Sequence, residues 1–202
     1  MMADPRSLFT RRARLLALRA MASCGLLLSG CDSGPLRGVA LDPPKAIPMF
    51  AFTRANGAMF ETKPAGDGLM VFFFGYTNCP DVCPTTLADW KRVKARLGGD
   101  TSRVQFVFVT VDPERDTPDV AQKYAEGFDR SFIGVSGDSA TTARIQQAFG
   151  VASIRDATTA DAEYLVSHSS QSFLVNGEGR LVSMYSFGSG WDALLDDIKR
   201  LL

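Results

Sequence analysis

Residues 69–84 read LMVFFFGYTNCPDVCP, and this stretch joins an apolar run to a pair of cysteines. The run from Leu69 to Tyr76 is continuously apolar, which is typical of a strand covered on both faces. Proline follows both Cys79 and Cys83, and proline is tolerated in the first turn of a helix, where its missing N–H costs no hydrogen bond. The stretch therefore predicts a buried central strand followed by a helix that begins near Cys83.

The rest of the chain continues this alternation of apolar runs and helical patterns. Such an order, closed by a hairpin and a last helix, indicates an α/β sandwich. Before the central strand, MFAF (49–52) and AMFET (58–62) flank the turn signal ANG, which predicts a hairpin. After it, we expect a helix ending at Gly98, a strand over 103–111, a helix over 117–128, a strand over 132–137, a helix over 139–149, a hairpin over 170–185 and a final helix over 191–202.

The N-terminus has the features of an export signal. Arginines precede an apolar stretch over residues 20–28, which is too short to span a bilayer as a permanent helix. LLSGC (27–31) resembles a lipobox, in which Cys31 is lipidated and becomes the first residue of the mature protein; the alternative is a plain signal peptide. We therefore expect a lipoprotein signal peptide over 1–30, a Gly- and Pro-rich flexible tether over 31–47 and a folded domain over 48–202.

Removal of residues 1–30 changes the charge and the thiol count. The whole chain has a formal net charge of 0, and the loss of five arginines and one aspartate makes it −4. A net negative charge argues against nucleic acid as a partner. With Cys31 bound to lipid, Cys79 and Cys83 are the two thiols that remain, in an exported compartment where exposed pairs tend to oxidise.

Three interpretations of the cysteine pair follow from its spacing. A structural disulfide is disfavoured because a loop this short restricts the unfolded chain only weakly. Thiol–disulfide exchange is a stronger alternative, although its usual motif has two intervening residues rather than three. A helix N-terminus beside the pair also favours thiolate, so we expect a lowered thiol pKa.

Copper is the third interpretation. Soft thiolates select Cu(I), and an imidazole is an acceptable further ligand, whereas a closed structural zinc site needs four ligands. The chain contains one histidine, His168, in LVSHSSQSFLV. It follows an irregular polar stretch (152–163) and opens the hairpin expected beside the central strands. From that position its ring could face Cys79 and Cys83.

The loop DPERDTP (112–118) follows the second buried strand and should open on the same edge as the cysteines. We expect Asp112 to adjust the site without binding the metal. Glu114, Arg115 and Asp116 are interpreted as a solvated turn.

Four segments together resemble the Sco/SenC family of copper metallochaperones over about Ile47 to Leu202. The resemblance implies a thioredoxin-like three-layer sandwich with an N-terminal hairpin extension. It also implies that Cys79, Cys83 and His168 bind Cu(I) or Cu(II). One departure is Ser167, where family members commonly have an aspartate. The segments are FFFGYTNCPDVCPTTL (72–87), VTVDPERDTP (109–118), FIGVSG (132–137) and VSHSSQSFLVNGEGRLV (166–182).

The resemblance further implies assembly of the binuclear copper centre of cytochrome c oxidase. We therefore expect a copper chaperone that is lipid-anchored at the periplasmic face of the bacterial inner membrane. Its partner would be the copper domain of oxidase subunit II or another periplasmic copper protein. We expect a metallochaperone rather than an enzyme; the alternative is a thiol–disulfide oxidoreductase that maintains the cysteines of a partner. His168 separates the two, because thiol exchange does not need a third ligand.

Overall fold

A computed structural model describes residues 34–64, 66–156 and 164–202. The expected signal peptide and the lipidated Cys31 lie outside these residues. Within the described part, none of the helices combines the length and the apolar character needed to cross a membrane.

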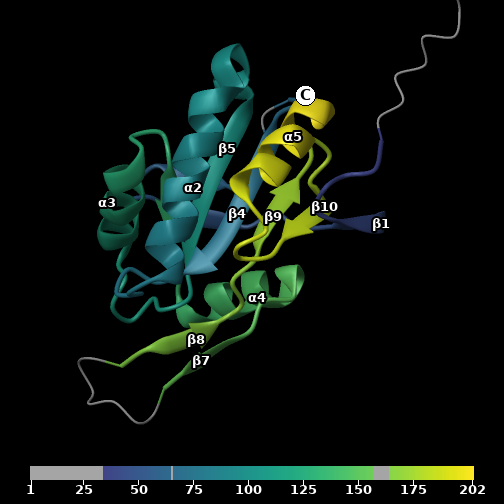
Figure 1. Cartoon of the computed structure of the whole chain (residues 1–202). Helices are drawn as coiled ribbons and strands as arrows, with labels where there is room; N and C mark the ends of the chain where they lie inside the picture. Colours follow the sequence, from purple (N-terminus) through teal and green to yellow (C-terminus); the bar gives the residue numbers. More distant parts are fainter. Residues whose placement is uncertain (1–33, 65, 157–163) are drawn as a thin grey trace, which may run out of the picture. The chain divides into compact units, whose positions relative to one another are not determined.

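A six-stranded sheet forms the middle of the domain (Figure 1). Its central strand β4 is buried along its whole length, as the continuous apolar run predicts. Strands β4, β5 and β6 run parallel, while β9 pairs antiparallel to β4 and is extended by β10 and β1. The strand order is β1 (Val39–Ala46), β10 (Arg180–Tyr185), β9 (Ser172–Val175), β4 (Leu69–Gly75), β5 (Val104–Thr110) and β6 (Ile133–Val135).

Helices cover both faces of this sheet, and aromatic side chains of β4 pack against a helix on each face. Phe73 packs edge-on against Trp90 of helix α2, with 6.2 Å between the ring centroids. Phe72 and Phe74, which point to the opposite face, pack against Phe149 of α4 at 5.0 and 5.1 Å. The predicted three-layer sandwich is therefore confirmed. Its helices are α2 (Val82–Leu97), the 3-10 turn η1 (Gly98–Arg103), α3 (Pro118–Phe128), α4 (Ser139–Phe149) and α5 (Trp191–Leu201).

Two short antiparallel ribbons lie outside the sheet. β2 (Ala51–Thr53) and β3 (Met59–Glu61) form the predicted N-terminal hairpin. β7 (Ser153–Arg155) and β8 (Val166–His168) form a second ribbon, which the sequence analysis did not predict because it treated residues 152–163 as irregular. Strands of three residues are too short to show a periodic pattern. The second ribbon projects at the bottom of Figure 1 and carries His168 at its end.

The tether prediction is wrong for residues 39–46, which form β1 at the edge of the sheet. Val39 and Ala40 pair with Met184 and Ser183, and the pairing resumes at Lys45 after an irregularity. Pro43 lies within that interruption, where a residue that cannot donate a hydrogen bond is tolerated on an edge strand. A Pro-rich stretch can therefore join a sheet when it occupies the edge.

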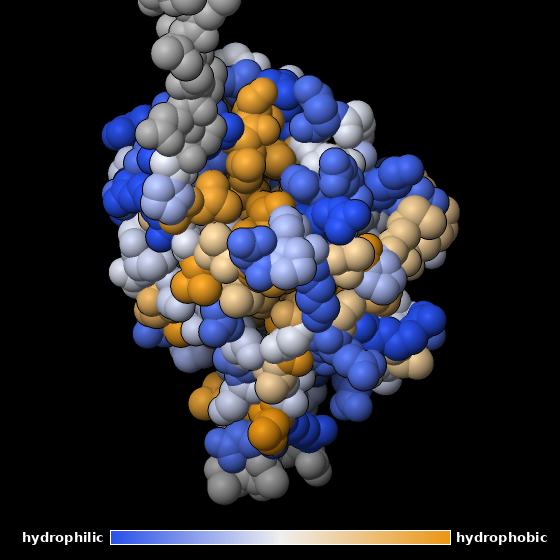
Figure 2. Space-filling model, turned by 90° about the vertical axis from the view of Figure 1, so that its right-hand side faces the viewer, coloured by the Kyte–Doolittle hydropathy of each residue, from blue (hydrophilic) through white to orange (hydrophobic). Residues whose placement is uncertain are grey.

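Figure 2 shows the side of the molecule that lies to the right in Figure 1, where β1 forms the edge of the sheet. Apolar residues gather in the upper half of this face, and hydrophilic residues surround them. On β1 itself, Val39 is 62% exposed. The edge strand therefore shields the sheet while leaving part of its own apolar surface in solvent.

Candidate metal centre

The two cysteines lie where β4 ends and α2 begins. Cys83 is in the first turn of α2 and is fully buried, whereas Cys79 in the preceding loop is half-buried. Gly75, the last residue of β4, makes room for the buried thiol, since a Cβ there would lie 2.7 Å from Cys83 Sγ. The position at the carboxyl end of the central strand matches the sequence prediction.

The second ribbon brings His168 to these cysteines from 85 residues further along the chain. His168 Nε2 lies 3.5 Å from Cys83 Sγ, and the backbone N–H of Cys83 donates to Cys79 Sγ at 3.4 Å. One potential ligand atom from each of the three residues lies within 4.8 Å of the other two. The structure thus brings together the three residues that the sequence analysis singled out.

The spacing of these atoms suits a single soft metal ion. Metal bonds of about 2.0–2.3 Å to sulfur or imidazole nitrogen place two ligand atoms of one ion about 3.5–4 Å apart. The three atoms here lie within 4.8 Å of one another, so small shifts would bring all of them around one ion. Two thiolates and one imidazole form a donor set that favours copper. Among the described residues, this is the one cluster of at least three cysteine, histidine or acidic side chains placed to hold a metal.

The hydrogen bonding and packing of the His168 ring prepare it as a ligand. Nδ1 lies 2.9 Å from the backbone carbonyl oxygen of Ser169, and a carbonyl can only accept, so Nδ1 carries the proton. The neutral ring then presents the lone pair of Nε2 to Cys83. Phe73 and Tyr76 meet the ring edge-on, with centroids 5.9 and 5.8 Å away, and restrict its rotation.

Burial dominates the electrostatics of the buried ligands. It raises the pKa of the Cys83 thiol far above its ordinary value, and the hydrogen bond with Cys79 adds to the effect. The expected lowering of the thiol pKa by the helix N-terminus is therefore wrong for Cys83. Burial also lowers the pKa of His168, which keeps its ring neutral over a wider pH range. A bound cation would offset the cost of a buried thiolate, because metal binding drives thiol deprotonation.

Asp112, which we expected to adjust the site without binding the metal, contacts Tyr164 and Arg115. Its carboxylate accepts hydrogen bonds from the hydroxyl of Tyr164 at 2.6 Å and from Nε of Arg115 at 2.5 Å. In the described part of the chain, Asp112 forms hydrogen bonds with Thr110, Arg115, Asp116 and Tyr164 rather than with Cys79, Cys83 or His168. Asp112 therefore anchors Tyr164, which precedes the strand that carries the histidine.

Asp116 is the carboxylate that sequence reasoning missed. It is 1% exposed and accepts hydrogen bonds from both the backbone N–H and the hydroxyl of Thr77 (2.9 and 2.6 Å) and from the hydroxyl of Thr110 (2.7 Å). Thr77 lies two residues before Cys79, so Asp116 fixes the start of the cysteine loop. Its negative charge also contributes to the raised pKa of Cys83. The sequence signal for a buried carboxylate was the pair Thr77 and Thr110, which stand at the ends of two neighbouring strands. Buried hydroxyl groups need a hydrogen-bond partner.

Ser167, the departure from the family pattern, is exposed on β8 and pairs with Ile154 of β7. Adjacent residues on a strand point to opposite faces, so Ser167 points away from the face on which His168 meets Cys83. An aspartate at this position would therefore lie on the outer face of the ribbon.

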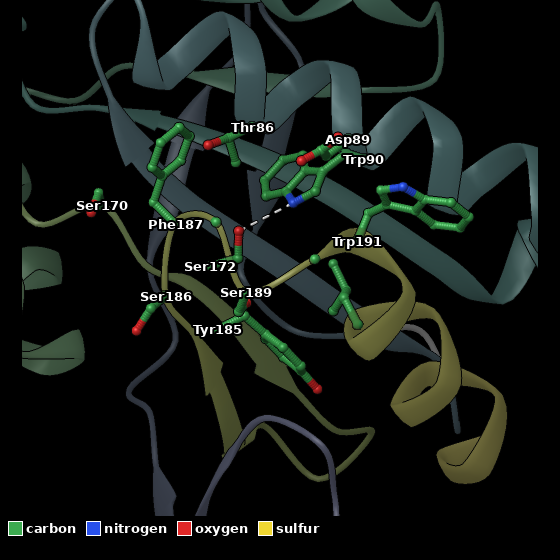
Figure 3. Close-up of a pocket in the computed structure, with 13 residues that line it drawn as sticks. Thr86, Asp89, Trp90, Ser170, Ser172, Tyr185, Ser186, Phe187, Ser189 and Trp191 are labelled. Carbon is green, nitrogen blue, oxygen red and sulfur yellow. Dashed lines mark hydrogen bonds between the residues drawn. The ribbon is translucent and has the colours of Figure 1, made fainter.

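A pocket adjoins the metal centre on the α2 side (Figure 3). Thr86 lies one helical turn after Cys83, and Ser170 lies two residues after His168, so the pocket continues from both sets of ligands. Inside it, Nε1 of Trp90 donates to Ser172 Oγ at 3.2 Å and ties α2 to β9. Its lining contains hydroxyl and aromatic groups and the carboxylate of Asp89, but none of the three candidate ligands.

Comparisons with known proteins agree with this geometry. A family model described as SCO1/SenC matches residues 40–202, beginning earlier than the motifs alone indicated. The apo Sco1 structure from Thermus thermophilus has a TM-score of 0.75 and 39% identity, over 84% of this chain and 99% of that one. The structure of Bradyrhizobium japonicum ScoI with copper bound has a TM-score of 0.70 and 34% sequence identity. The match covers 78% of this chain and 99% of that one. A relative from Stutzerimonas stutzeri, described as a candidate copper-binding protein, is 36% identical over 138 residues, which are 68% of this chain and 67% of the relative.

Proposed function

Because the chain belongs to the SCO1/SenC family, we propose that it is a copper chaperone that binds one copper ion through Cys79, Cys83 and His168. One observation carries the proposal: the three ligand atoms lie within 4.8 Å of one another, although they come from two distant parts of the chain. The similarity to ScoI with copper bound supports copper as the ion.

Each ligand residue has a distinct part in loading. Binding displaces the thiol protons of Cys79 and Cys83, and the released protons leave to solvent or buffer. His168 needs no deprotonation, since its Nδ1 proton is held by the Ser169 carbonyl and Nε2 is free to bind. A three-residue ligand set leaves room for a ligand from a partner, and the half-buried Cys79 and His168 are reached from solvent. Transfer then proceeds by exchange of ligands between the two proteins.

The proposal extends to location and partner. LLSGC (27–31) supports lipid attachment at Cys31 and display of the domain at the periplasmic face of the bacterial inner membrane. The family membership supports delivery to the binuclear copper centre of cytochrome c oxidase, in its subunit II copper domain, with another periplasmic copper protein as the alternative acceptor.

Copper titration of the reduced protein tests the proposal. We expect one copper per chain, loss of binding in Cys79→Ser or Cys83→Ser, and marked weakening in His168→Ala. Ser167→Ala is the matched control, because this neighbour is exposed on the same strand and should bind as wild type does. Stoichiometric binding that survives removal of both cysteines would sink the proposal. Transfer of the copper to an apo oxidase copper domain then tests the role as a donor.

A second function is favoured by a specific contact. Cys79 is the more accessible thiol, and it receives the backbone N–H of Cys83 at a helix N-terminus. This arrangement also suits attack on a partner disulfide. An oxidoreductase would turn over with a protein disulfide at the same rate in His168→Ala as in wild type, whereas a copper chaperone would bind the ion markedly more weakly in that variant.

A further inference from the structure

His168 lies on a ribbon whose strands, in the described part of the chain, pair with one another and not with the main sheet. These strands, β7 and β8, have three residues each. A two-stranded ribbon is marginally stable by itself. The position of the imidazole therefore depends on side-chain contacts between the ribbon and the rest of the domain.

Tyr164, two residues before β8, makes one group of these contacts; another is the hydrogen bond from Nε2 of Gln146 on α4 to Ser153 Oγ on β7, at 2.7 Å. The ring of Tyr164 is 4% exposed and lies between two guanidinium groups, with Cζ of Arg115 at 3.5 Å and Cζ of Arg155 at 3.6 Å from the ring centroid. Two groups this close to one centroid must occupy opposite faces of the ring. Because Arg155 belongs to β7 and Arg115 to the 112–118 loop, the stack joins the ribbon to the domain. The Asp112 carboxylate links two members of the stack, because it accepts hydrogen bonds from both Arg115 and Tyr164.

Arg115 also reaches the ring that supports the histidine. Its Cζ lies 5.8 Å from the centroid of Tyr76, and the Tyr76 ring meets His168 edge-on. Tyr76 lies in the segment that leads to Cys79, whose backbone N–H donates to the Tyr76 carbonyl at 3.2 Å. Arg115 thus contacts both the aromatic residue that anchors the ribbon and the one against which the imidazole rests.

We propose that Arg115 is a positioning residue for His168, a role that rests on the proposed copper function. The stack needs a planar guanidinium, which lies flat on an aromatic ring while its Nε bonds Asp112; a lysine ammonium keeps the charge but lacks the plane. The residue is largely buried, with 18% of its side chain exposed, and its Nη2 has no hydrogen-bond partner among the described residues. This arrangement uses the guanidinium for packing more than for hydrogen bonding.

The test compares Arg115→Lys with Arg92→Lys, an exposed arginine on α2 that serves as the matched control. We expect Arg115→Lys to weaken copper binding by about 10–100-fold, as for other residues that orient a metal ligand. In a His168→Ala background, the same substitution should weaken binding by less than about twofold, because it acts through the histidine. An equal loss in both backgrounds, or no loss in either, overturns the proposal.

A measurement without copper separates this proposal from the function on which it rests. The chain has one histidine, so its ring resonances are unambiguous in an NMR spectrum. The edge-on rings of Tyr76 and Phe73 shift those resonances, and Arg115→Lys should move them toward the values of a solvent-exposed histidine. Resonances unchanged from wild type, in a variant with wild-type thermal stability, overturn the positioning role even if copper binding is confirmed. If the wild-type protein fails to bind copper, the proposed function is overturned. The NMR comparison still decides whether Arg115 positions His168.

Discussion

The cysteine side and the histidine side of the metal centre are held in different ways. Cys79 and Cys83 follow a fully buried central strand, Cys79 in the loop and Cys83 in the first turn of a helix that packs on the core. His168 ends a short ribbon that side-chain contacts hold against the domain, among them those around Tyr164 and the hydrogen bond of Gln146 with Ser153. The comparison indicates that the cysteines share the stability of the whole domain, while the histidine can lose its place without global unfolding.

The largest effect expected on the cysteine side comes from Asp116→Ala. The variant leaves the Thr77 backbone N–H and two threonine hydroxyls without their buried acceptor. Each unsatisfied donor costs roughly 1–3 kcal/mol, so the free energy of unfolding should fall by about 3 kcal/mol or more. Urea denaturation of the reduced apo protein measures it. A loss below about 0.5 kcal/mol, typical of a surface site, would contradict the rigid attachment of this side.

A smaller, local effect is expected on the histidine side from Tyr164→Phe, which removes the hydrogen bond to Asp112 but keeps the ring. Loss of such a bond costs about 1 kcal/mol, equivalent to roughly a fivefold increase in local opening. Amide hydrogen exchange should quicken at Asp156 and Ser169, whose N–H groups bond across the ribbon. Amides of β4 should exchange as in wild type, and equal acceleration there would show that the two sides open together.

Between about pH 6 and pH 9 the changes in stability should be the smallest of the three, and acid and alkali should act on different sides of the site. His168 has a lowered pKa when folded, so the unfolded chain binds its proton first and the apo protein loses stability as the pH falls below about 6.5. Cys83 has a raised pKa when folded, so the unfolded chain loses its proton first and stability falls as the pH rises above about 8.5. Thermal unfolding across this range measures both limbs. His168→Ala should remove only the acid limb and Cys83→Ser only the alkaline one.

The parts that sequence reasoning predicted well are those with long, regular patterns. The apolar run of β4 and the capped helix over 139–149 were found within a residue or two, because burial and helical periodicity leave strong signals. The cysteine pair and the sole histidine were found by donor chemistry. β1 and the β7–β8 ribbon were missed, since neither prolines at a sheet edge nor three-residue strands produce a pattern. Asp116 was misjudged because its hydrogen bonds come from Thr77, after β4, and Thr110, at the end of β5, and the sequence does not show that these two meet.

The edge strand β1 has a consequence for the order in which the protein is made. Its partner β10 lies about 140 residues later, so a chain synthesised from its N-terminus holds β1 unpaired until β10 has been made. Contacts between such distant segments form late and slowly. Pro43 and Pro44 remove two N–H donors from the waiting strand, which reduces its capacity to pair with other chains. The prolines that hid β1 from sequence analysis would thus protect the nascent protein from aggregation.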